Sequence, residues 1–537
     1  MQDINAFKIE QDHTFDTDIC IVGGGAAGIA IAREFIGTDQ KVLVLESGSY
    51  SSDEKTQSLY DFESVGHPVR AQDGYVSRNR YLGGSTNTWA GRCAPLNRID
   101  YEQRDWVPDS GWPITYDCLD EYNQKASAFL KLTDFNDFIP KHWENYLLGN
   151  KHNFLADETF NLEVFLLARK PVNVRLEYIE ELQAASNIQV CINANVTEIE
   201  PSSTLTTVNK LHVTSFAGNN FFVNAKIYIL ACGGWENTRL LLLSRRYCAD
   251  GLGNQNDVVG RYYMEHPKIK LGYITPTTNT FKSPILLGRK KIHRGSLIHK
   301  GSLLLGIKLA DQIQREERLL NHYVELFPMY PDGMTEAINA FSKSFSAQAI
   351  KNNLTKFSPF MFQWAEFFAR MYLNMPIQYE RVAITSHFEH APNRESRIML
   401  GNQRDALGLN RLKVNLKISS EEKRSIVRFH EILSKVLQEQ GLGHLTSEFP
   451  DAESFWPDLT DSSHHMGTTR MSLDPKKGVV DENCRVHGMN NLYVASSSVF
   501  PTVGHVNPTM TIVALSLRLA DHLKNIAVPK LSSLINV

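Results

Sequence analysis

The sequence predicts an α/β fold in which a Rossmann-like dinucleotide-binding domain is assembled from distant parts of the chain. The first observation is a glycine-rich turn near the N-terminus, where residues 18–28 read Asp-Ile-Cys-Ile-Val-Gly-Gly-Gly-Ala-Ala-Gly. The second is a pair of C-terminal segments, His464–Arg470 and Phe500–Pro508, which bring histidine and asparagine side chains to the start of a helix. The third is the length, because 537 residues exceed one ordinary core and suggest about two to four domains.

The composition is that of a globular protein, with 42% hydrophobic residues, 21% charged residues and a net charge of −3. We therefore expect no nucleic-acid partner. No run of about 18 uninterrupted apolar residues occurs, which argues against a transmembrane helix, and residues 1–18 lack the apolar core of a secretory signal. The seven cysteines are scattered without a CxxC pair, so we expect no disulfide framework, no metal site and a cytoplasmic location.

Strand, turn, helix, strand and acid follow one another at the N-terminus in the order of a dinucleotide-binding unit. Thr17–Val22 is rich in β-branched residues, as expected for a buried parallel strand. The glycine turn follows at once, Ile29–Phe35 has helical composition, and Lys41–Leu45 predicts a second buried strand that ends at Glu46. These flanks distinguish the motif from a chance glycine turn but do not separate FAD from NAD.

Each glycine of this unit has a predicted role. Gly23 permits the tight turn, Gly25 lets the backbone approach a pyrophosphate, and Gly28 lets helix and strand pack closely. The helix start carries partial positive charge toward the phosphates, and Glu46 is placed to bond an adenosine ribose hydroxyl. The cofactor contacts expected here are Gly23, Gly25, Ala26, Ala27, Gly28, Glu46 and Ser47.

A second glycine segment, residues 80–91, reads Arg-Tyr-Leu-Gly-Gly-Ser-Thr-Asn-Thr-Trp-Ala-Gly. The simplest interpretation is an ordinary loop. The functional interpretation is a backbone run along a flavin ring or its pyrophosphate, since the glycine pair leaves N–H groups accessible. The contacts expected here are Gly83, Gly84, Ser85, Asn87 and Thr88. Ser110–Tyr116 then predicts a turn before a helix over 119–131.

These segments and the Gly-Trp-Pro of residues 111–113, in this order, resemble the glucose–methanol–choline (GMC) oxidoreductase family. Similar matches extend over Val190–Glu198, Ala231–Arg239, Val259–Pro267 and Asp405–Gly408. Roughly residues 275–380 carry no recognisable pattern. The sequences Gly-Thr-Thr-Arg-Met and Asn-Pro-Thr are nearest to the branch that contains pyranose oxidases and bacterial sugar dehydrogenases.

The resemblance implies a discontinuous FAD-binding domain and a second, α+β substrate domain built on an antiparallel sheet. The FAD-binding domain would comprise residues 1–95, 190–270 and 455–537, and the substrate domain would comprise residues 96–189 and 271–454. It also implies that Val190–Glu198 forms one strand, with Val196 against the adenine. Cys232 and Gly233 would contact the cofactor between a returning strand and its helix.

The catalytic residues implied by the resemblance are His464 and Asn507, with His465 as the rival base. A neutral imidazole accepts the proton of a substrate hydroxyl, hydride passes to flavin N5, and the Asn507 amide donates to the alkoxide. Asn507, Pro508 and Thr509 open a final helix over 510–523, whose positive start would face the flavin. A lone histidine usually has a structural role, and we expect that role for His266 and His505.

Two positions depart from the family pattern. Pyranose oxidases that attach flavin covalently carry histidine just before the tryptophan of the Ser-Thr segment, whereas this chain has Thr88 before Trp89. Threonine cannot form that imidazole link, so we expect non-covalent FAD. Ser496 stands where many members have aspartate in the strand before Pro501, and it is expected to contact the cofactor.

Three other segments carry local predictions. Leu412–Ile418 predicts a strand, and Ser420, with the acids after it and a periodic apolar run, predicts a capped helix that ends at Gly441. Residues 358–372 are unusually aromatic. The simplest interpretation of that segment is a packed core helix; a lid, an interfacial membrane helix and an acceptor-docking surface are the alternatives.

The leading hypothesis is an FAD-dependent dehydrogenase or oxidase that oxidises a CH–OH group of a sugar, a glycoside or another alcohol. Its electron acceptor would be oxygen, a quinone or a redox protein. The alternatives are a lyase or a light-driven fatty-acid decarboxylase with the same fold, and a non-catalytic flavin-binding protein. The presence of both His464 and Asn507 favours alcohol oxidation. An NAD-only dehydrogenase is disfavoured because it would leave the C-terminal helix start without a role.

Overall fold

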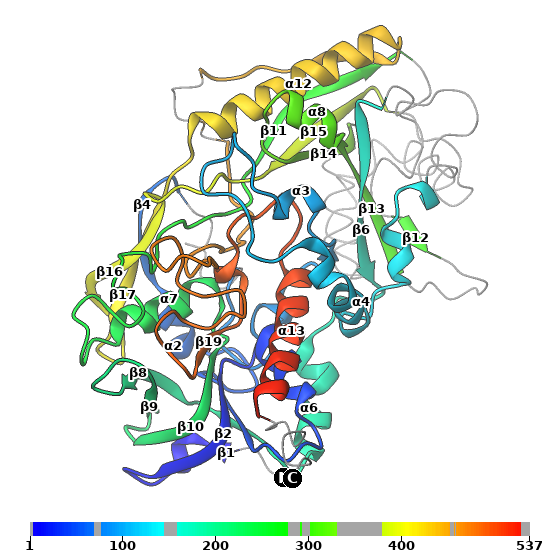
Figure 1. Cartoon of the computed structure of the whole chain (residues 1–537). Helices are drawn as coiled ribbons and strands as arrows, with labels where there is room; N and C mark the ends of the chain where they lie inside the picture. Colours follow the sequence, from blue (N-terminus) through cyan, green and yellow to red (C-terminus); the bar gives the residue numbers. More distant parts are fainter. Residues whose placement is uncertain are drawn as a thin grey trace, which may run out of the picture.

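Two large sheets, one at each end of the molecule, organise the fold (Figure 1). The computed structural model describes residues 4–68, 77–143, 158–277, 290–292, 301–329, 379–451, 456 and 458–527. One sheet is mostly parallel and the other antiparallel, which confirms the predicted α/β fold with a second domain on an antiparallel sheet. The domain boundaries stay a prediction, and the aromatic segment 358–372 lies outside the described residues.

The first sheet has the strand order β1-β7-β3-β2-β10-β9-β8, with β19 beside β10. All its pairs are parallel except β10 with β9 and β9 with β8. Its strands are β1 (Ile4–Asn5), β2 (Thr14–Val22), β3 (Val42–Leu45), β7 (Ile188–Ile192), β8 (Asn195–Pro201), β9 (Val208–Thr214), β10 (Asn220–Leu230) and β19 (Leu492–Val494).

The centre of this sheet is buried on both faces, which explains the continuous apolar runs that predicted it. β3 is buried at every position, and β2 is buried over its last four residues. The single strand predicted over 190–198 is wrong, because the chain breaks into β7 and β8 at Asn193, where φ is +59°. There the Asn193 and Ala194 N–H groups donate to the carbonyls of Gly48 and Glu46, in the loop after β3.

Helices pack beside this sheet, and α13 runs from the middle of the molecule toward its lower end (Figure 1). α1 packs against α13 and α6, and α13 packs against α4. The final helix, α13, begins one residue before the predicted 510–523 and ends four residues after it. These helices are α1 (Ala26–Glu34), α4 (Asp120–Phe129), α6 (Val174–Ala184), α7 (Gly233–Leu243) and α13 (Thr509–Ala527).

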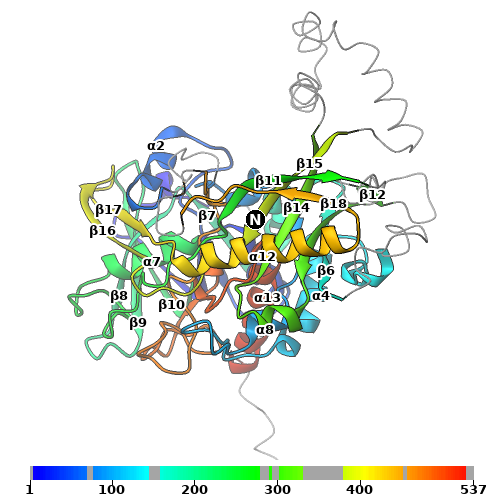
Figure 2. The ribbon, with the colours of Figure 1, turned by 90° about the horizontal axis from the view of Figure 1, so that it is seen from above.

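The second sheet has the order β18-β11-β15-β14-β13-β6-β5, with β12 beside β13, and all its pairs are antiparallel. α12 (Ser420–Glu439) lies across one face of it, as the view from above shows (Figure 2). Its strands are β5 (Arg92–Cys93), β6 (Phe160–Ala168), β11 (Lys268–Pro276), β12 (Lys290–Ile292), β13 (Gly301–Leu309), β14 (His322–Met329), β15 (Arg381–Phe388) and β18 (Gly443–Thr446).

The apolar period of α12 fixes this packing. Phe429, Leu433 and Leu437 recur every four residues and are buried in one cluster with β14 and β15. The cap lies one residue before the predicted one: the Ser419 side chain accepts from the N–H of Glu421, and Glu422 completes a capping box.

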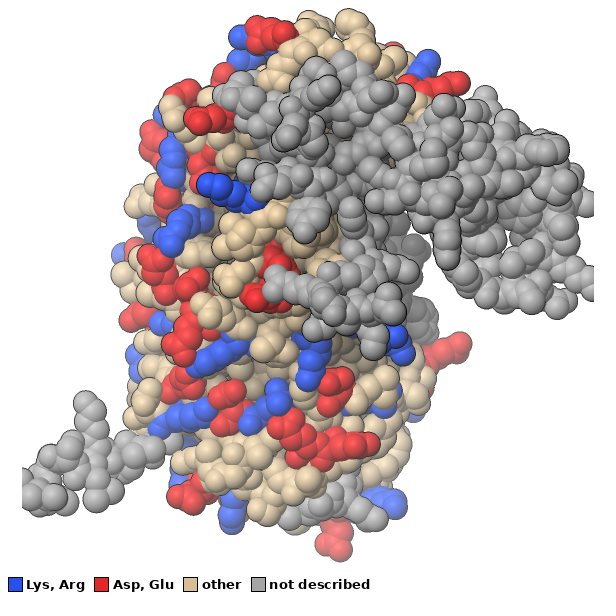
Figure 3. Space-filling model, turned by 90° about the vertical axis from the view of Figure 1, so that its right-hand side faces the viewer, with Lys and Arg blue, Asp and Glu red and all other residues tan. Residues whose placement is uncertain are grey.

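A small three-stranded sheet joins distant segments beside α7. Its strands are β4 (Phe62–Gly66), β16 (Arg397–Arg404) and β17 (Asn410–Leu416), in the order β16-β17-β4. On the described part of the face in Figure 3, acidic and basic side chains are interspersed. No helix in the described ranges is both long and apolar enough to cross a membrane.

Candidate active site

A cavity of about 1270 Å³ lies between the two large sheets and is lined by elements of both. It brings together the N-terminal glycine turn, the second glycine segment, the starts of α7 and α13, and strands of the antiparallel sheet. The predicted site residues that line it are Gly23, Gly25, Ala26, Ala27, Glu46, Ser47, Gly84, Ser85, Thr88, Val196, Cys232, Gly233, His464, His465, Ser496, Asn507, Pro508 and Thr509.

Gly28, Gly83 and Asn87 shape the cavity wall without lining it. A Cβ on Gly28 would lie 1.9 Å from the carbonyl oxygen of Gly23, so α1 and β2 need glycine there to pack closely. Gly83 has φ +98°, and the Asn87 amide donates to the carbonyl of Gly84 at 2.8 Å. These three residues therefore hold the turn and the loop that carry the lining residues.

The N-terminal turn leaves backbone donors available at the cavity. Gly25 caps α1 without a side-chain hydrogen bond, and a Cβ added to it would meet only the Cα of Gly84, at 3.9 Å. The two Glu46 oxygens each accept one backbone N–H, from Gly24 and Gly48, at 2.9 Å. Because a carboxylate oxygen has two lone pairs, each retains one for a ribose hydroxyl.

Further predicted contacts are held in place by asparagine side chains. Asn237 accepts from the N–H of Cys232 at 2.8 Å and donates to Ser496 Oγ at 3.1 Å, which ties the start of α7 to the turn after β19. Asn79 donates to Thr88 Oγ1 at 2.5 Å. Ser496 is therefore positioned by protein contacts although it lies in a turn, not in the strand that was predicted.

Arg78 is a cavity residue that motif reasoning missed. It is 7% exposed, and its guanidinium lies over the rings of Tyr60 and Trp235, 4.4 and 4.3 Å from their centroids. Within the described residues, its Nε and Nη1 groups are buried without a hydrogen-bond partner, and the Glu236 carboxylate is 3.6 Å from Nη1. Buried donors of this kind fit an acceptor-rich group. An arginine just before the second glycine segment was the available signal.

A chain of hydrogen bonds runs through the predicted catalytic residues. His464 Nε2 lies 3.2 Å from Asn507 Nδ2, and His464 Nδ1 lies 3.0 Å from His266 Nδ1. His266 Nε2 in turn lies 3.0 Å from the carbonyl oxygen of Val503. His266, which was expected to be structural, thus touches the candidate base directly.

The chemistry of these atoms fixes where the protons are. The Val503 carbonyl only accepts, so His266 Nε2 carries a hydrogen. In a neutral His266, Nδ1 then accepts, and His464 Nδ1 must donate to it. His464 Nε2 is left with a lone pair that accepts from the Asn507 amide, so the chain of contacts has one consistent proton arrangement.

The surroundings favour the neutral form of both imidazoles. Burial lowers the pKa of His266 to about 3, and the nearby His505 and His387 add to the effect. Removal from water, together with the neighbouring His266 and His465, holds the pKa of His464 well below its usual 6.5. Near neutral pH the Nε2 atom of His464 is therefore unprotonated and available as a base.

His465 occupies a different environment. Its ring packs on Trp235 with centroids 4.0 Å apart, and its Nε2 lies 3.5 Å from the Glu265 carboxylate. Glu265 also accepts from the backbone N–H of His464 at 2.7 Å and from the Tyr263 hydroxyl at 2.7 Å. Burial raises the pKa of Glu265 well above its ordinary value. Glu265 thus holds the His464 backbone in place through the hydrogen bond from the His464 N–H.

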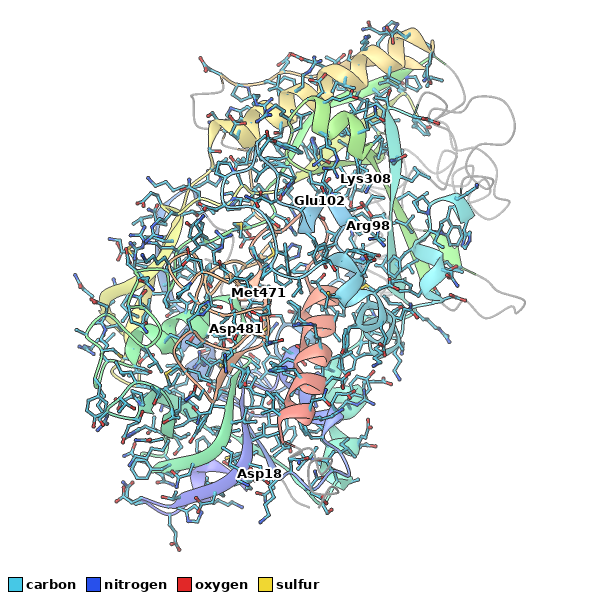
Figure 4. All side chains as sticks on the ribbon, viewed as in Figure 1. Asp18, Arg98, Glu102, Lys308, Met471 and Asp481 are labelled. Carbon is cyan, nitrogen blue, oxygen red and sulfur yellow. The ribbon has the colours of Figure 1, made fainter. Side chains whose placement is uncertain are left out.

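His505 anchors the loop that carries Asn507. Its Nε2 lies 2.8 Å from Glu163 on β6, and the Lys308 ammonium on β13 lies 3.2 Å from the same carboxylate oxygen. Although burial alone would raise it, these two partners lower the pKa of Glu163 to about 2. In Figure 4, Lys308 lies in the upper part of the molecule, above α13.

Comparison with known proteins places this geometry in a family. The family model described as GMC oxidoreductase matches residues 392–516, the segment that carries His464 and Asn507. The chain belongs to the GMC oxidoreductase family. As a GMC oxidoreductase it is a flavoprotein, and FAD is its cofactor.

Its relatives are distant. It is 25% identical to the fructose dehydrogenase large subunit of Gluconobacter japonicus over 305 residues, which are 56% of this chain and 48% of that one. The match therefore spans about half the length of that relative. It is 21% identical to the 6'''-hydroxyparomomycin C oxidase of Streptomyces lividus over 94% of this chain and 92% of that one.

A solved structure shares the fold of this GMC oxidoreductase. A formate oxidase variant from Aspergillus oryzae superposes with a TM-score of 0.53, at 17% identity, over 95% of this chain and 98% of that one. At that identity the likeness shows the fold alone. The fit to FAD rests on the cavity itself. An open Gly25 backbone, an uncapped start of α1 and the Arg78 Nε and Nη1 groups, which have no hydrogen-bond partner among the described residues, suit a pyrophosphate.

Proposed function

We propose that this GMC oxidoreductase oxidises a CH–OH group to a carbonyl, with His464 as the base and Asn507 as the group that holds the alkoxide. Bound FAD would supply the hydride acceptor. The observation that carries the proposal is the hydrogen-bond chain from Val503 through His266 and His464 to Asn507. It presents one unprotonated imidazole nitrogen and one amide donor side by side at the cavity.

A substrate hydroxyl that enters between these groups would replace one hydrogen bond with two. Its O–H would donate to His464 Nε2, and its oxygen would accept from Asn507 Nδ2. As the proton moves to Nε2, the amide faces the growing negative charge on oxygen, which is where preorganised donors stabilise a transition state. Such base assistance contributes about 10²–10⁴ in rate.

His266 supports the base without a charge of its own. Its Nδ1 accepts from His464 Nδ1, so it fixes the ring in the tautomer that leaves Nε2 free, and it remains hydrogen-bonded when His464 becomes an imidazolium. The chain ends at the Val503 carbonyl, which cannot take a proton. The abstracted proton therefore stays on the histidine pair until it returns to the cavity.

We further propose that FAD is held without a covalent bond by the predicted contact residues. The N–H groups at the start of α1 and the Arg78 guanidinium would meet the pyrophosphate, and Glu46 would meet the ribose. The start of α13 at Thr509 would face the flavin ring. Thr88, the residue before Trp89, has a hydroxyl in place of the imidazole that forms the covalent link in some relatives.

The test is anaerobic mixing of the flavin-loaded protein with sugars, glycosides and simple alcohols while the visible flavin absorption is followed. We expect bleaching by one class of alcohol and release of the flavin on acid precipitation. A protein that binds FAD but is bleached by none of these alcohols would contradict the proposed oxidation. Flavin that remains with the precipitated chain would contradict non-covalent binding.

A further inference from the structure

The antiparallel sheet presents a patterned face to the cavity. On its other face, Val324, Leu326 and Ile384 pack into the cluster under α12. Directly opposed residues of antiparallel strands project to the same face, so the cavity side forms rows across β11, β15 and β14. The three rows are Lys268–His387–Tyr323, Lys270–Thr385–Glu325 and Tyr273–Ala383–Phe327, and all of these residues except Tyr273 line the cavity.

The first row lies beside the proposed catalytic pair. Lys268 follows His266 by two residues, and His266 is hydrogen-bonded to the base. At the other end of the row, the Tyr323 ring lies 5.0 Å from the ring of His505, two residues before Asn507. A molecule with its reacting carbon at that pair would therefore extend along the strands, over the second row and then the third.

The first two rows offer hydrogen-bond donors and acceptors. Arg92 pairs with Glu325 and donates to the Tyr323 hydroxyl at 3.2 Å, and His387 Nε2 lies 3.7 Å from Glu325. Thr385 Oγ1 is buried and has no hydrogen-bond partner within the described part of the chain. An alkyl chain laid over these groups would take them out of water without replacing their hydrogen bonds, which is costly, whereas sugar hydroxyls would replace them.

The third row is apolar and partly open. Ala383 stands between two aromatic residues, Tyr273 and Phe327. Phe327 is 40% exposed and Met329 is 38% exposed, and with Pro328 both line the cavity. Along β14 this row is four residues beyond the first, a distance of about 13 Å. The cavity face of the sheet thus changes from hydrogen-bonding side chains to aromatic side chains over about the length of a sugar ring and its substituent.

We propose that the cavity selects a glycoside whose sugar ring lies over the two polar rows and whose apolar, planar aglycone lies over the third. This assignment rests on the proposed oxidation for its orientation, which puts a sugar hydroxyl at His464. A long-chain alcohol would cover the two polar rows with its alkyl chain and leave their hydrogen bonds to water unreplaced. A free sugar would leave the aromatic row without a partner, although aromatic rings contribute strongly to binding.

The test separates binding from turnover. Flavin-loaded His464→Ala protein, which we expect to turn over slowly, is titrated by calorimetry with phenyl and methyl glycosides of the same sugar, for glucose, galactose and xylose, and with 1-dodecanol. The titrations are repeated with Phe327→Ser and Thr385→Val added to it. Phe7→Ser is the matched control, because Phe7 is 43% exposed and is not among the cavity-lining residues.

We expect the phenyl glycoside of one sugar to bind about tenfold more tightly than its methyl partner, the scale of burying part of an aromatic ring. Phe327→Ser should remove this preference and leave methyl-glycoside affinity unchanged, and Thr385→Val should weaken both. Equal affinities, a preference that survives Phe327→Ser, no glycoside binding or tighter binding of 1-dodecanol would each overturn the proposal. Glycosides that bind but never bleach wild-type flavin would overturn the proposed oxidation instead.

Discussion

The two ends of the cavity are built in different ways. At the end proposed to hold the dinucleotide, the cavity lining comes largely from backbone: a glycine turn, an uncapped helix start and a second glycine loop. At the end proposed to be catalytic, the lining includes the side chains of His266, His464 and Asn507, which are linked across more than 200 residues of sequence. A backbone cradle needs glycines at fixed spacing and so leaves a motif. A side-chain site needs only that scattered residues meet once the chain has folded.

The largest expected effect is the loss of FAD in Gly25→Val. A side chain at position 25 would meet little of the protein, so the variant should fold. The valine side chain would instead occupy the space proposed for the pyrophosphate. Flavin content per folded chain, with circular dichroism as the folding check, measures this. Gly401→Val is the control, since a Cβ there makes only ordinary contacts away from the cavity. A fully flavinated Gly25→Val protein would refute the cradle.

The next effect tests the side-chain end through Asn507→Leu. Loss of the amide donor should slow anaerobic flavin reduction by about 10²–10³-fold, as removal of one oxyanion donor does elsewhere. Asn507→His should keep more of the rate because an imidazole N–H restores a donor. Wild-type rates in the leucine variant would remove Asn507 from the mechanism.

His266 tests whether the tautomer of the base matters. His266→Leu removes the acceptor of His464 Nδ1 and should slow flavin reduction by about 10–100-fold, the value of a hydrogen bond to a charged group. His266→Gln can still accept and donate, so it should recover most of the rate. The readout is the rate against pH. If His266 had only a structural role, both substitutions would lower the rate of flavin reduction equally and would leave its pH dependence unchanged.

The smallest effect is a pH dependence of stability. His430 is buried between Ser386 and Ser447, and burial lowers its pKa to about 4, as it lowers that of His266 to about 3. Such histidines stay neutral in the fold but gain a proton on unfolding below pH 6.5. Each should therefore lower the free energy of unfolding by about 1.4 kcal/mol per pH unit as the pH falls from 6.5 toward the folded pKa.

Urea unfolding at pH 7 and pH 5 measures this slope. His430→Gln should flatten it by the contribution of one histidine, because glutamine does not titrate. The same slope in wild type and in His430→Gln would contradict the assignment of a neutral, buried His430.

Much of the fold was predictable because local signals agreed with it. The apolar runs of β2 and β3, the glycine turn and the capping residues of α12 each depend on neighbours in sequence. The break between β7 and β8 was not predictable, since it arises from hydrogen bonds to a loop about 145 residues earlier, near Gly48.

The site divides along the same line. Gly25, Gly84 and His464 stand in motifs, and they line the cavity, whereas Arg78 and His266 also line it but were not among the predicted contacts. Arg78 is defined by its place between Tyr60 and Trp235, and His266 by a bond to a residue 198 positions away. The rows on β11, β14 and β15 depend on strand register, which sequence alternation alone does not give.

The most direct test of the central claim compares flavin reduction in His464→Ala and His465→Phe with wild type, in anaerobic single turnovers with the best alcohol. Phenylalanine preserves the stacking of residue 465 on Trp235 but cannot accept a proton. The account predicts that His464→Ala retains FAD and is slower by at least about 10²-fold, while His465→Phe stays near wild type. Normal reduction in His464→Ala, with loss of reduction in His465→Phe, would contradict it.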